Sequence, residues 1–338
     1  MIEVRTPSRI HFGLLAYHPQ RGRQFGGVGL MLRRPDVAIR VTTNPASGDF
    51  EGSGRMADRA VGFARRFAQS ALADRLTAHV PPARIEVRRV PRPHTGLGSG
   101  TQLGMAVARA MAGLIERDDL GADAFSRLVG RGRRSAVGVH GSFLGGLIVD
   151  GGKIEASRLS PLVSRQQFPR DWRIVLVRPR ALHGLAGDFE RRAFAELPPI
   201  GAMLTARMCQ LVLLGLLPAL AERDVDQFGE ALFELQQLAG ECFKPAQGGV
   251  YADASLARIV DHIRGRGVRG VGQSSWGPTL YAICATEEAA RDLEGDLRHQ
   301  FNLDPDETLV TSADDHGATL RRLPQDRDDG APLPMKAE

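Results

Sequence analysis

A run of glycines and hydroxyl side chains around residue 98 is the segment of this sequence best suited to chemistry. It follows an alternating stretch typical of a β-strand, residues 84–90, and precedes a helical pattern that starts near Ser99 or Thr101. Glycines let the backbone approach a ligand closely, and the first turn of a helix offers unpaired N–H groups to an anion. We therefore predict a phosphate or pyrophosphate site, with a ligand-free turn as the alternative. The candidate substrate-binding residues are His94, Gly96, Leu97, Gly98, Ser99, Gly100, Thr101 and Gln102.

Cationic side chains elsewhere in the sequence are suited to meet such an anion. Arg9 and His11 alternate along a predicted strand and so point to one face, unless they are a surface arginine and a core histidine. Arg134 and Ser135 follow an arginine-rich segment and are placed to reach a phosphate, although such segments also form solvated helix ends. Lys244 is one of three lysines, and we place it in a loop where it grips a phosphate or is solvated.

Two further segments carry polar groups suited to a small substrate. Arg23 and Gln24 precede a turn built on Gly26 and Gly27, which we predict to be a mobile lid with substrate-binding residues, with solvated arginines as the alternative. Glu190 is a candidate magnesium ligand or an acceptor for ribose hydroxyls. An ordinary acidic residue near a helix N-terminus is its alternative role.

A second glycine loop supplies donors near the end of the chain. Gln273, Ser274 and Ser275 offer amide and hydroxyl groups to a substrate. Trp276 is suited to form a wall against an aromatic substrate, with a core tryptophan as the alternative.

Composition narrows the classes of function. The 338 residues suggest about two domains, and the net charge of +5 is carried almost wholly by arginine. Aromatic residues, at 6%, are too few to form stacking platforms, which argues against nucleic acid as a partner and favours small anionic substrates. The three cysteines lie far apart, which excludes a disulfide framework and makes a zinc site unexpected.

The sequence predicts no membrane segment and a cytoplasmic location. Its richest apolar stretch, residues 211–217, meets Pro218 well before the roughly 20 residues that span a bilayer. The N-terminus lacks the basic and apolar regions of a signal peptide.

The spacing of apolar residues predicts two α+β regions. The second region, with the order strand, long helices, strand, helix, strand, follows a linker at residues 161–169, and a glycine-rich turn precedes its second strand. Strands are predicted at residues 2–5, 9–15, 37–43, 84–90, 142–149, 173–178, 279–285 and 308–312. Helices are predicted at residues 56–76, about 99–115, 122–129, 189–196, 200–221, 225–239, 255–264 and 287–300.

Three segments together resemble the GHMP kinase superfamily of small-molecule kinases. Residues 93–102 resemble its phosphate loop, residues 135–146 its mid-chain motif and residues 270–278 its C-terminal glycine loop. The resemblance implies a two-domain GHMP-kinase-like α+β fold and suggests a homodimer. The implied parts are an N-terminal domain like ribosomal protein S5 domain 2 (1–165), a ferredoxin-like C-terminal domain (170–323) and a disordered tail (324–338).

The chain departs from the kinase pattern where kinases carry out their chemistry. The aspartate that orients or deprotonates the attacking hydroxyl falls on Gly138. A serine that ligates magnesium in several kinases falls on Gly100, although Thr101 is placed to substitute. The chain instead resembles one branch of the superfamily, the beta-ribofuranosylaminobenzene 5'-phosphate synthase (beta-RFAP synthase) family, at residues 8–15, 24–29, 183–190 and 273–278.

This second resemblance implies a decarboxylating phosphoribosyltransferase. It would join 5-phosphoribosyl 1-pyrophosphate (PRPP) and 4-aminobenzoate, releasing pyrophosphate and carbon dioxide, in tetrahydromethanopterin biosynthesis. Such a reaction needs no base to activate a hydroxyl, so the loss of the aspartate is expected. We assign catalytic roles to Arg9, His11 and Lys244. Magnesium is expected mainly on the substrate pyrophosphate, with the protein ligands Ser99, Thr101 and Glu190.

Two other functions stay open at this stage. One is an ATP-dependent kinase of the same superfamily, which would need a substitute for the missing aspartate. The other is a non-catalytic sensor that keeps only the anion site and binds PRPP without turnover. Comparing the affinities for ATP and PRPP separates the kinase from the other two.

Overall fold

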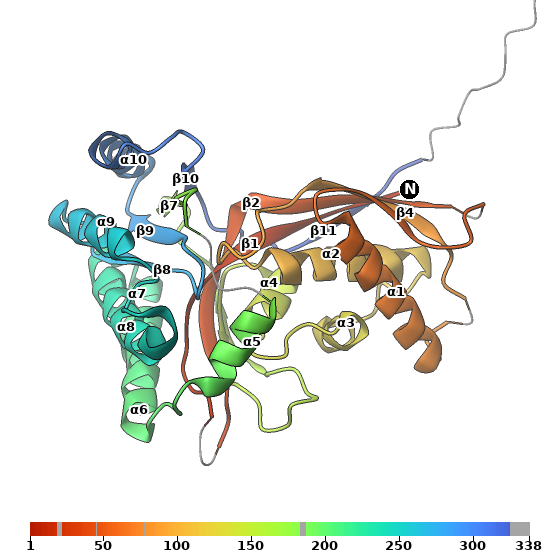
Figure 1. The fold of residues 1–338 in the computed structure, drawn as a ribbon, viewed down its shortest axis with the longest axis horizontal. Helices are drawn as coiled ribbons and strands as arrows, with labels where there is room; N and C mark the ends of the chain where they lie inside the picture. The colour runs from red at the N-terminus through yellow and green to blue at the C-terminus, as the bar shows by residue number, and fades with distance from the viewer. Residues whose placement is uncertain (19–21, 45, 78, 183–186, 325–338) are drawn as a thin grey trace, which may run out of the picture.

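The computed structural model of the chain describes residues 1–18, 22–44, 46–77, 79–182 and 187–324. Figure 1 shows two α+β bodies side by side, each a sheet with helices packed against it. The first, red to yellow, contains α1 to α4, and the second contains α6 to α10 in green to blue. The two-part α+β architecture expected from the sequence is therefore observed. The predicted tail lies, beyond residue 324, outside the described residues.

The first sheet is built on a long antiparallel pair, β1 and β2. Its order is β11-β1-β2-β4-β3, with β5 pairing with β2 and β6 pairing with β5. The strands are β1 (Ile2–Leu14), β2 (Gly27–Thr43), β3 (Glu51–Gly54), β4 (Ala83–Arg89), β5 (Leu147–Asp150), β6 (Leu162–Gln166) and β11 (Thr319–Arg322). β1 joins two predicted strands into one, and its pairing with β2 shifts register at Pro7/Ser8 and at His11/Gly13, so Arg9 and His11 lie between these two irregularities.

Four helices accompany this sheet: α1 (Ala57–Ala73), α2 (Ser99–Leu114), α3 (Ala122–Val129) and α4 (Val137–Leu144). α2 is buried on nearly all sides, because it packs between β1 and α1 and carries mostly small or apolar residues. Its first turn is therefore held firmly in place. That turn begins at the glycine segment singled out in the sequence.

The second sheet has the antiparallel order β10-β7-β9-β8. Its strands are β7 (Arg173–Val177), β8 (Gly270–Gln273), β9 (Leu280–Cys284) and β10 (Thr308–Thr311). The remaining helices are α5 (Gly187–Glu196), α6 (Ala202–Leu211), the π-helix η1 (Val212–Leu216), α7 (Leu217–Glu222), α8 (Val225–Gln247), α9 (Ala254–Gly265) and α10 (Glu287–Phe301). One apolar core joins the two bodies, since Phe12 of β1 packs in the same cluster as Phe228 of α8 and Tyr281 of β9.

Two stretches around α4 differ from the prediction. Residues 142–149, predicted as a strand, end α4 and then form β5. The hydroxyl of Ser142 donates to the carbonyl of Val139 inside the helix, and Gly145 ends the helix with a φ of 62°. A short apolar run does not distinguish helix from strand by periodicity, which explains the error. The predicted linker at 161–169 contains β6.

Three features of the second half also differ. The predicted glycine-rich turn contains β8, where a Cβ on Gly270 would lie only 3.1 Å from the Cα of Gly229 in α8. The glycine permits close packing of helix on strand rather than a turn. The helix expected to end at Ala239 continues to Gln247. β11 pairs with β1, so the end of the predicted domain at 170–323 returns to the first sheet.

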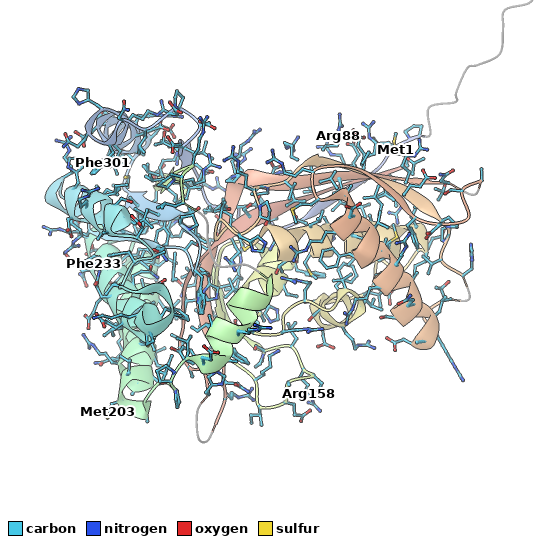
Figure 2. The ribbon with its side chains drawn as sticks, in the orientation of Figure 1. Met1, Arg88, Arg158, Met203, Phe233 and Phe301 are labelled. Carbon is cyan, nitrogen blue, oxygen red and sulfur yellow. The ribbon has the colours of Figure 1, made fainter. Side chains whose placement is uncertain are left out.

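The helices α6, η1 and α7 form one continuous apolar helix. This segment, Ala202–Glu222, is long and apolar enough to cross a membrane by length and composition alone, and 33% of its most apolar window is buried. It continues through Pro218, in agreement with the helix predicted at residues 200–221. Pro218 directly follows the π-helix η1, so the hydrogen-bond pattern of the helix is already altered where the proline N–H is missing. Met203, labelled in Figure 2 at the lower tip of the second body, is 85% exposed. Leu213 and Leu214 are 64% and 70% exposed.

A buried carboxylate ties three strands of the first sheet together. Asp36 of β2 is 4% exposed and accepts hydrogen bonds from Arg5 of β1 and Arg89 of β4, each at 2.8 Å from Oδ2. Burial alone would raise the pKa of Asp36, but the two guanidinium groups outweigh burial and hold that pKa below its ordinary value.

We expect Asp36→Asn to lower the free energy of unfolding by about 3 kcal/mol at neutral pH, because two arginines then face a buried site without a charge. The folded pKa of Asp36 is lowered, so its stabilising contribution is present above the unfolded pKa and is lost as the pH falls through the folded pKa. The variant should lack this part of the acid dependence. Urea denaturation at neutral and acidic pH measures both effects. Asp49→Asn, which removes an exposed partner of Arg65, is the control, and equal losses in both variants would contradict the assignment.

Candidate active site

A cavity of about 870 Å³ collects most of the predicted site residues. It is lined by the phosphate loop, β1, α1, the segment before α4, α8 and the second glycine loop. No aspartate or glutamate is among its lining residues in the described part of the chain, so the cavity is strongly cationic. Its six arginines are Arg9, Arg59, Arg66, Arg131, Arg133 and Arg134.

The phosphate loop ends at a helix without a side-chain cap. Gly98, the N-cap residue of α2, has a φ of 70°, a conformation that favours glycine. The first hydrogen bonds of the helix run from Thr101 and Gln102 to the carbonyl of Gly98. The N–H groups of Ser99 and Gly100 come before these bonds, and both residues line the cavity. An anion here would meet two available N–H groups and the positive end of the helix dipole.

Arg9 supports the phosphate loop as well as lining the cavity. Its Nη1 donates to the carbonyl of Gly96 at 2.7 Å, and its backbone N–H donates to the carbonyl of Leu97 at 3.2 Å. A Cβ on Gly98 would lie 2.9 Å from the Cγ of Arg9, so this position has no room for a side chain. Leu97 itself is buried in the core and does not line the cavity.

The two glycine loops are joined by Ser274. Its hydroxyl donates to the carbonyl of Gly96 at 2.8 Å and accepts the backbone N–H of His11 at 2.9 Å. Ser274 is fully buried, so its role is to hold the loops together. Gln273 and Ser275 line the cavity, as predicted from the sequence.

A carboxylate that the sequence analysis passed over lies behind the cavity wall. Asp150, at the end of β5, accepts hydrogen bonds from Ser135 Oγ at 2.7 Å and from the N–H of Ala136 at 2.8 Å. Burial raises the pKa of Asp150, and these hydrogen bonds oppose the rise. The Ser135 hydroxyl donates to Asp150 and accepts the N–H of Val137 at 3.1 Å, which leaves one lone pair for a sugar hydroxyl in the cavity that Ser135 lines.

His11 lies beside Ser135 with a buried ring. Its Nε2 is buried without a hydrogen-bond partner, and burial together with the nearby Arg9 lowers the pKa of His11 well below its usual value. The ring is therefore neutral at pH 7 and can accept or donate one hydrogen bond. A Cβ on Gly27 would lie 2.6 Å from Ser135 Oγ and 3.0 Å from His11 Nε2, so only glycine leaves both groups in place.

Aromatic rings form one part of the cavity wall. Trp276 packs edge-on against Phe243 with ring centroids 5.1 Å apart, and Phe194 lies 6.0 Å from the same tryptophan. The guanidinium of Arg134 lies 4.3 Å from the centre of the Phe194 ring. A flat aromatic substrate would find both ring faces and a cation on this wall.

Eight predicted site residues do not line the cavity. Leu97, Ser274 and Gly27 pack directly behind its lining residues, and five others are held elsewhere. Lys244 lies on the surface of α8 rather than in a loop, 3.3 Å from Glu241, because the helix continues to Gln247. Arg23 Nη1 donates to the carbonyl of Gly152, and Gln24 pairs with Lys153 through its backbone.

The other two residues of this group are held by the protein itself. Gly26 accepts a backbone hydrogen bond from Leu15, so the predicted lid is anchored to β1 and to the segment after β5. Gln102 is buried and donates to the carbonyl of Gly138 at 2.8 Å. By contrast, His94, Gly96, Arg134 and Trp276 do line the cavity.

The sequence analysis missed two arginines of α1 and two phenylalanines. Arg59 and Arg66 share one face of α1 with the buried Phe63, at spacings of four and seven residues, and that spacing was the available signal. Phe194 and Phe243 come from α5 and α8, which only the tertiary structure brings beside Trp276.

The predicted magnesium ligands form no site among the described residues. Thr101 Oγ1 accepts a hydrogen bond from Arg131 Nη2 at 2.9 Å, and the side chain of Glu190 lies outside the described part. Within that part, no group of three or more His, Cys, Asp or Glu side chains is placed to hold a metal. Mg²⁺ prefers carboxylate and water oxygens, so a hydroxyl beside a guanidinium group does not fit a protein-bound ion.

Known proteins resemble the chain over nearly its whole length. It is 34% identical over 336 residues to "Beta-ribofuranosylphenol 5'-phosphate synthase" of Archaeoglobus fulgidus, covering 95% of this chain and 99% of that protein. It is 30% identical over 335 residues to the protein of the same name from Methanothermobacter thermautotrophicus, covering 94% and 98%. The predicted family is confirmed, although these names carry a phenol where the family name used above has an aminobenzene.

The fold is also shared with solved structures. Mevalonate diphosphate decarboxylase from Enterococcus faecalis has a TM-score of 0.66 at 15% identity, covering 95% of this chain and 99% of that chain. Homoserine kinase from Cytophaga hutchinsonii has a TM-score of 0.64 at 16% identity, covering 95% and 97%. Residues 216–303 match the family described as "GHMP kinases C terminal". The chain therefore has the predicted two-domain GHMP kinase fold and belongs to the beta-ribofuranosylphenol 5'-phosphate synthase family.

Proposed function

We propose that this protein is a decarboxylating phosphoribosyltransferase that joins PRPP to a 4-substituted benzoate. One observation carries the proposal: the cavity combines six arginines, no carboxylate among its described lining residues, and an aromatic wall. PRPP carries two phosphate-bearing ends and matches the cationic part. A benzoate ring matches the wall around Trp276.

The positions of the lining residues suggest how each substrate would lie in the cavity. The pyrophosphate of PRPP would lie at the N–H groups of Ser99 and Gly100, and the ribose would extend toward His11 and Ser135. The neutral His11 ring and the Ser135 oxygen are suited to hydrogen-bond ribose hydroxyls. The aromatic acid would then lie between the ribose and Trp276, with its ring against C1 of the sugar.

The chemistry needs charge neutralisation and fixed geometry rather than a base. The C1–oxygen bond of PRPP breaks and its electron pair leaves with pyrophosphate. The ring carbon that bears the carboxylate attacks C1 and forms the carbon–carbon bond. The bond to the carboxylate then breaks as carbon dioxide leaves, and its electron pair restores the aromatic ring.

A kinase reaction is less well supported by the same cavity. The position where the kinases carry their aspartate is Gly138, where a Cβ would lie 3.2 Å from Thr101 Cγ2 and 3.3 Å from Gln102 Nε2. α4 thus packs closely on α2 and leaves little room for a carboxylate side chain. A measurement of turnover is needed to distinguish a PRPP-binding sensor from the transferase.

The acceptor is proposed from the names of the relatives. They are named for a ribofuranosylphenol phosphate, and decarboxylation of 4-hydroxybenzoate during the transfer gives a phenol. The acceptor 4-aminobenzoate, expected from the first resemblance, would give an aminobenzene instead. Both acids belong in the assay because they differ in one substituent.

The experiment is to mix the protein with PRPP, magnesium and either acid, and to measure pyrophosphate and carbon dioxide. We expect equal amounts of both products, released only when an aromatic acid is present. In the proposed reaction, magnesium binds the pyrophosphate of PRPP as a counter-ion. Absence of acid-dependent pyrophosphate release with both acids would contradict the proposal, and tight PRPP binding without turnover would favour the sensor.

We expect Trp276→Ala to raise the KM for the aromatic acid about tenfold while leaving PRPP affinity unchanged, because one ring contact of the acceptor is lost. Trp276→Phe retains a ring and should retain most of the affinity. Steady-state kinetics and PRPP calorimetry measure the two effects, with thermal melting as the check on folding. A loss of PRPP affinity equal to the loss for the acid would show that Trp276 supports the fold instead.

We also propose that the chain forms a cytoplasmic homodimer through its exposed apolar helix. Met203, Leu213 and Leu214 expose large apolar side chains on the segment Ala202–Glu222, a pattern typical of protein interfaces. The three free cysteines agree with a reducing compartment.

We expect the double variant Leu213→Glu/Leu214→Glu to halve the mass in solution, because charges would be buried in the interface. Light scattering after gel filtration measures the mass, and Leu72→Glu, at an exposed leucine of α1, is the control. A wild-type protein that is monomeric would contradict the dimer. Binding of the wild type to lipid vesicles, lost in the double variant, would assign the helix to a membrane surface.

A further inference from the structure

Arginines from two separate elements surround the first turn of α2. Arg59 comes from α1, and Arg131 follows α3. Arg131 Nη2 donates to Thr101 Oγ1 at 2.9 Å, and a Cβ built on Gly100 would lie 2.6 Å from Nη2 and 2.9 Å from Cζ of Arg59. The Arg59 guanidinium group therefore lies directly against the backbone of Gly100, beside the N–H groups that we assign to the anion.

Glycines on α2 make room for both arginines. Gly100 and Gly104 are one helical turn apart and lie on the same face. A Cβ on Gly104 would lie 3.2 Å from Cγ of Arg131, so the stem of this arginine passes over Gly104. Side chains at either position would displace a guanidinium group from the start of the helix.

Arg59 differs from its neighbour Arg65 in its ion pairing within the described residues. No carboxylate of the described residues forms an ion pair with Arg59, whereas Arg65 on the same helix pairs with Asp49 at 2.6 Å. Arg66 points to the same cavity and packs against Gly130. Arginines that line one cavity attract a polyanion.

We infer that the leaving pyrophosphate is neutralised by an arginine clamp, Arg59 and Arg131, in place of a metal ion held by protein side chains. The inference rests on the proposed function, which supplies pyrophosphate as the leaving group. As the C1–oxygen bond breaks, its electron pair moves onto the pyrophosphate oxygen, and the growing negative charge meets the two guanidinium groups and the N–H groups of Ser99 and Gly100. The step transfers no proton, so no base is needed.

The clamp explains two departures from the kinase pattern together. Gly100 stands where several kinases carry a metal-ligating serine, and in this chain the space beside it is taken by Arg59. Thr101, the expected substitute ligand, is hydrogen-bonded to Arg131. A cation that ligates these hydroxyls would be repelled by both arginines.

The test measures binding of inorganic pyrophosphate by calorimetry, without PRPP or an aromatic acid, in EDTA and again in magnesium. We expect the wild type to bind pyrophosphate in EDTA. Arg59→Gln should weaken binding about tenfold or more, since a charged hydrogen-bonding group is lost. Arg59→Lys, which keeps the charge, should retain part of the affinity. Arg65→Gln, on the same helix and paired with Asp49, should bind like the wild type.

Gly100→Ala is a second variant that keeps every charge. Its methyl group pushes the Arg59 guanidinium aside, while alanine favours the helix, so the protein should melt no earlier than the wild type and still bind pyrophosphate more weakly. Normal pyrophosphate binding by both Gly100→Ala and Arg59→Gln would overturn the clamp.

Metal dependence gives a further way to overturn the inference. Wild-type protein that binds pyrophosphate only with magnesium would show that the two arginines do not suffice for the leaving group. Manganese that binds the protein alone at one site would show that the protein holds a metal there. Either result would overturn the inference. The outcomes separate this inference from the proposed function. Pyrophosphate binding through Arg59 without acid-dependent turnover would contradict the function only, and turnover with binding unaffected by Arg59 would contradict the clamp only.

Discussion

The site depends on a close contact between two glycine loops and strand β1. Ser274 bonds to the carbonyl of Gly96 and to the N–H of His11, and Arg9 bonds to the same Gly96 carbonyl from the other side. Backbone of Gly277 packs directly on backbone of Gly96, which a side chain on either residue would prevent. This contact joins the two domains at the floor of the cavity. The same contact fixes the orientation of the first turn of α2, which lines the cavity.

A second constraint is the balance of charge inside the cavity. Its arginines come from β1, α1 and the segment before α4, and its described lining residues include no carboxylate to compensate them. Asp150, a carboxylate near the cavity, lies behind Ser135 and accepts a hydrogen bond from its hydroxyl. The described lining of the cavity favours a polyanion as the ligand, in line with the proposed function.

Much of this protein was predictable from local sequence. α3 (Ala122–Val129) and the start of α2 at Ser99 were predicted because apolar periodicity and the glycine segment are local signals. The two-domain GHMP-kinase-like fold followed from three motifs that resemble the superfamily. The strand predicted at residues 142–149 and the loop predicted around Lys244 were wrong. Both errors concern helix ends, which depend on packing and on a terminating glycine such as Gly248.

Local sequence was enough to identify the segment suited to a phosphate and the family of the chain, because glycines and hydroxyls at a helix start are recognisable without their neighbours in space. Which side chains share the cavity depends on the tertiary structure. Arg59 and Phe243 come from helices far apart in the chain, and their roles arise from packing beside Gly100 and Trp276. Helical spacing indicates that Arg59 shares a face of α1 with Phe63, but it does not indicate which segment that face contacts, since the contact depends on long-range packing.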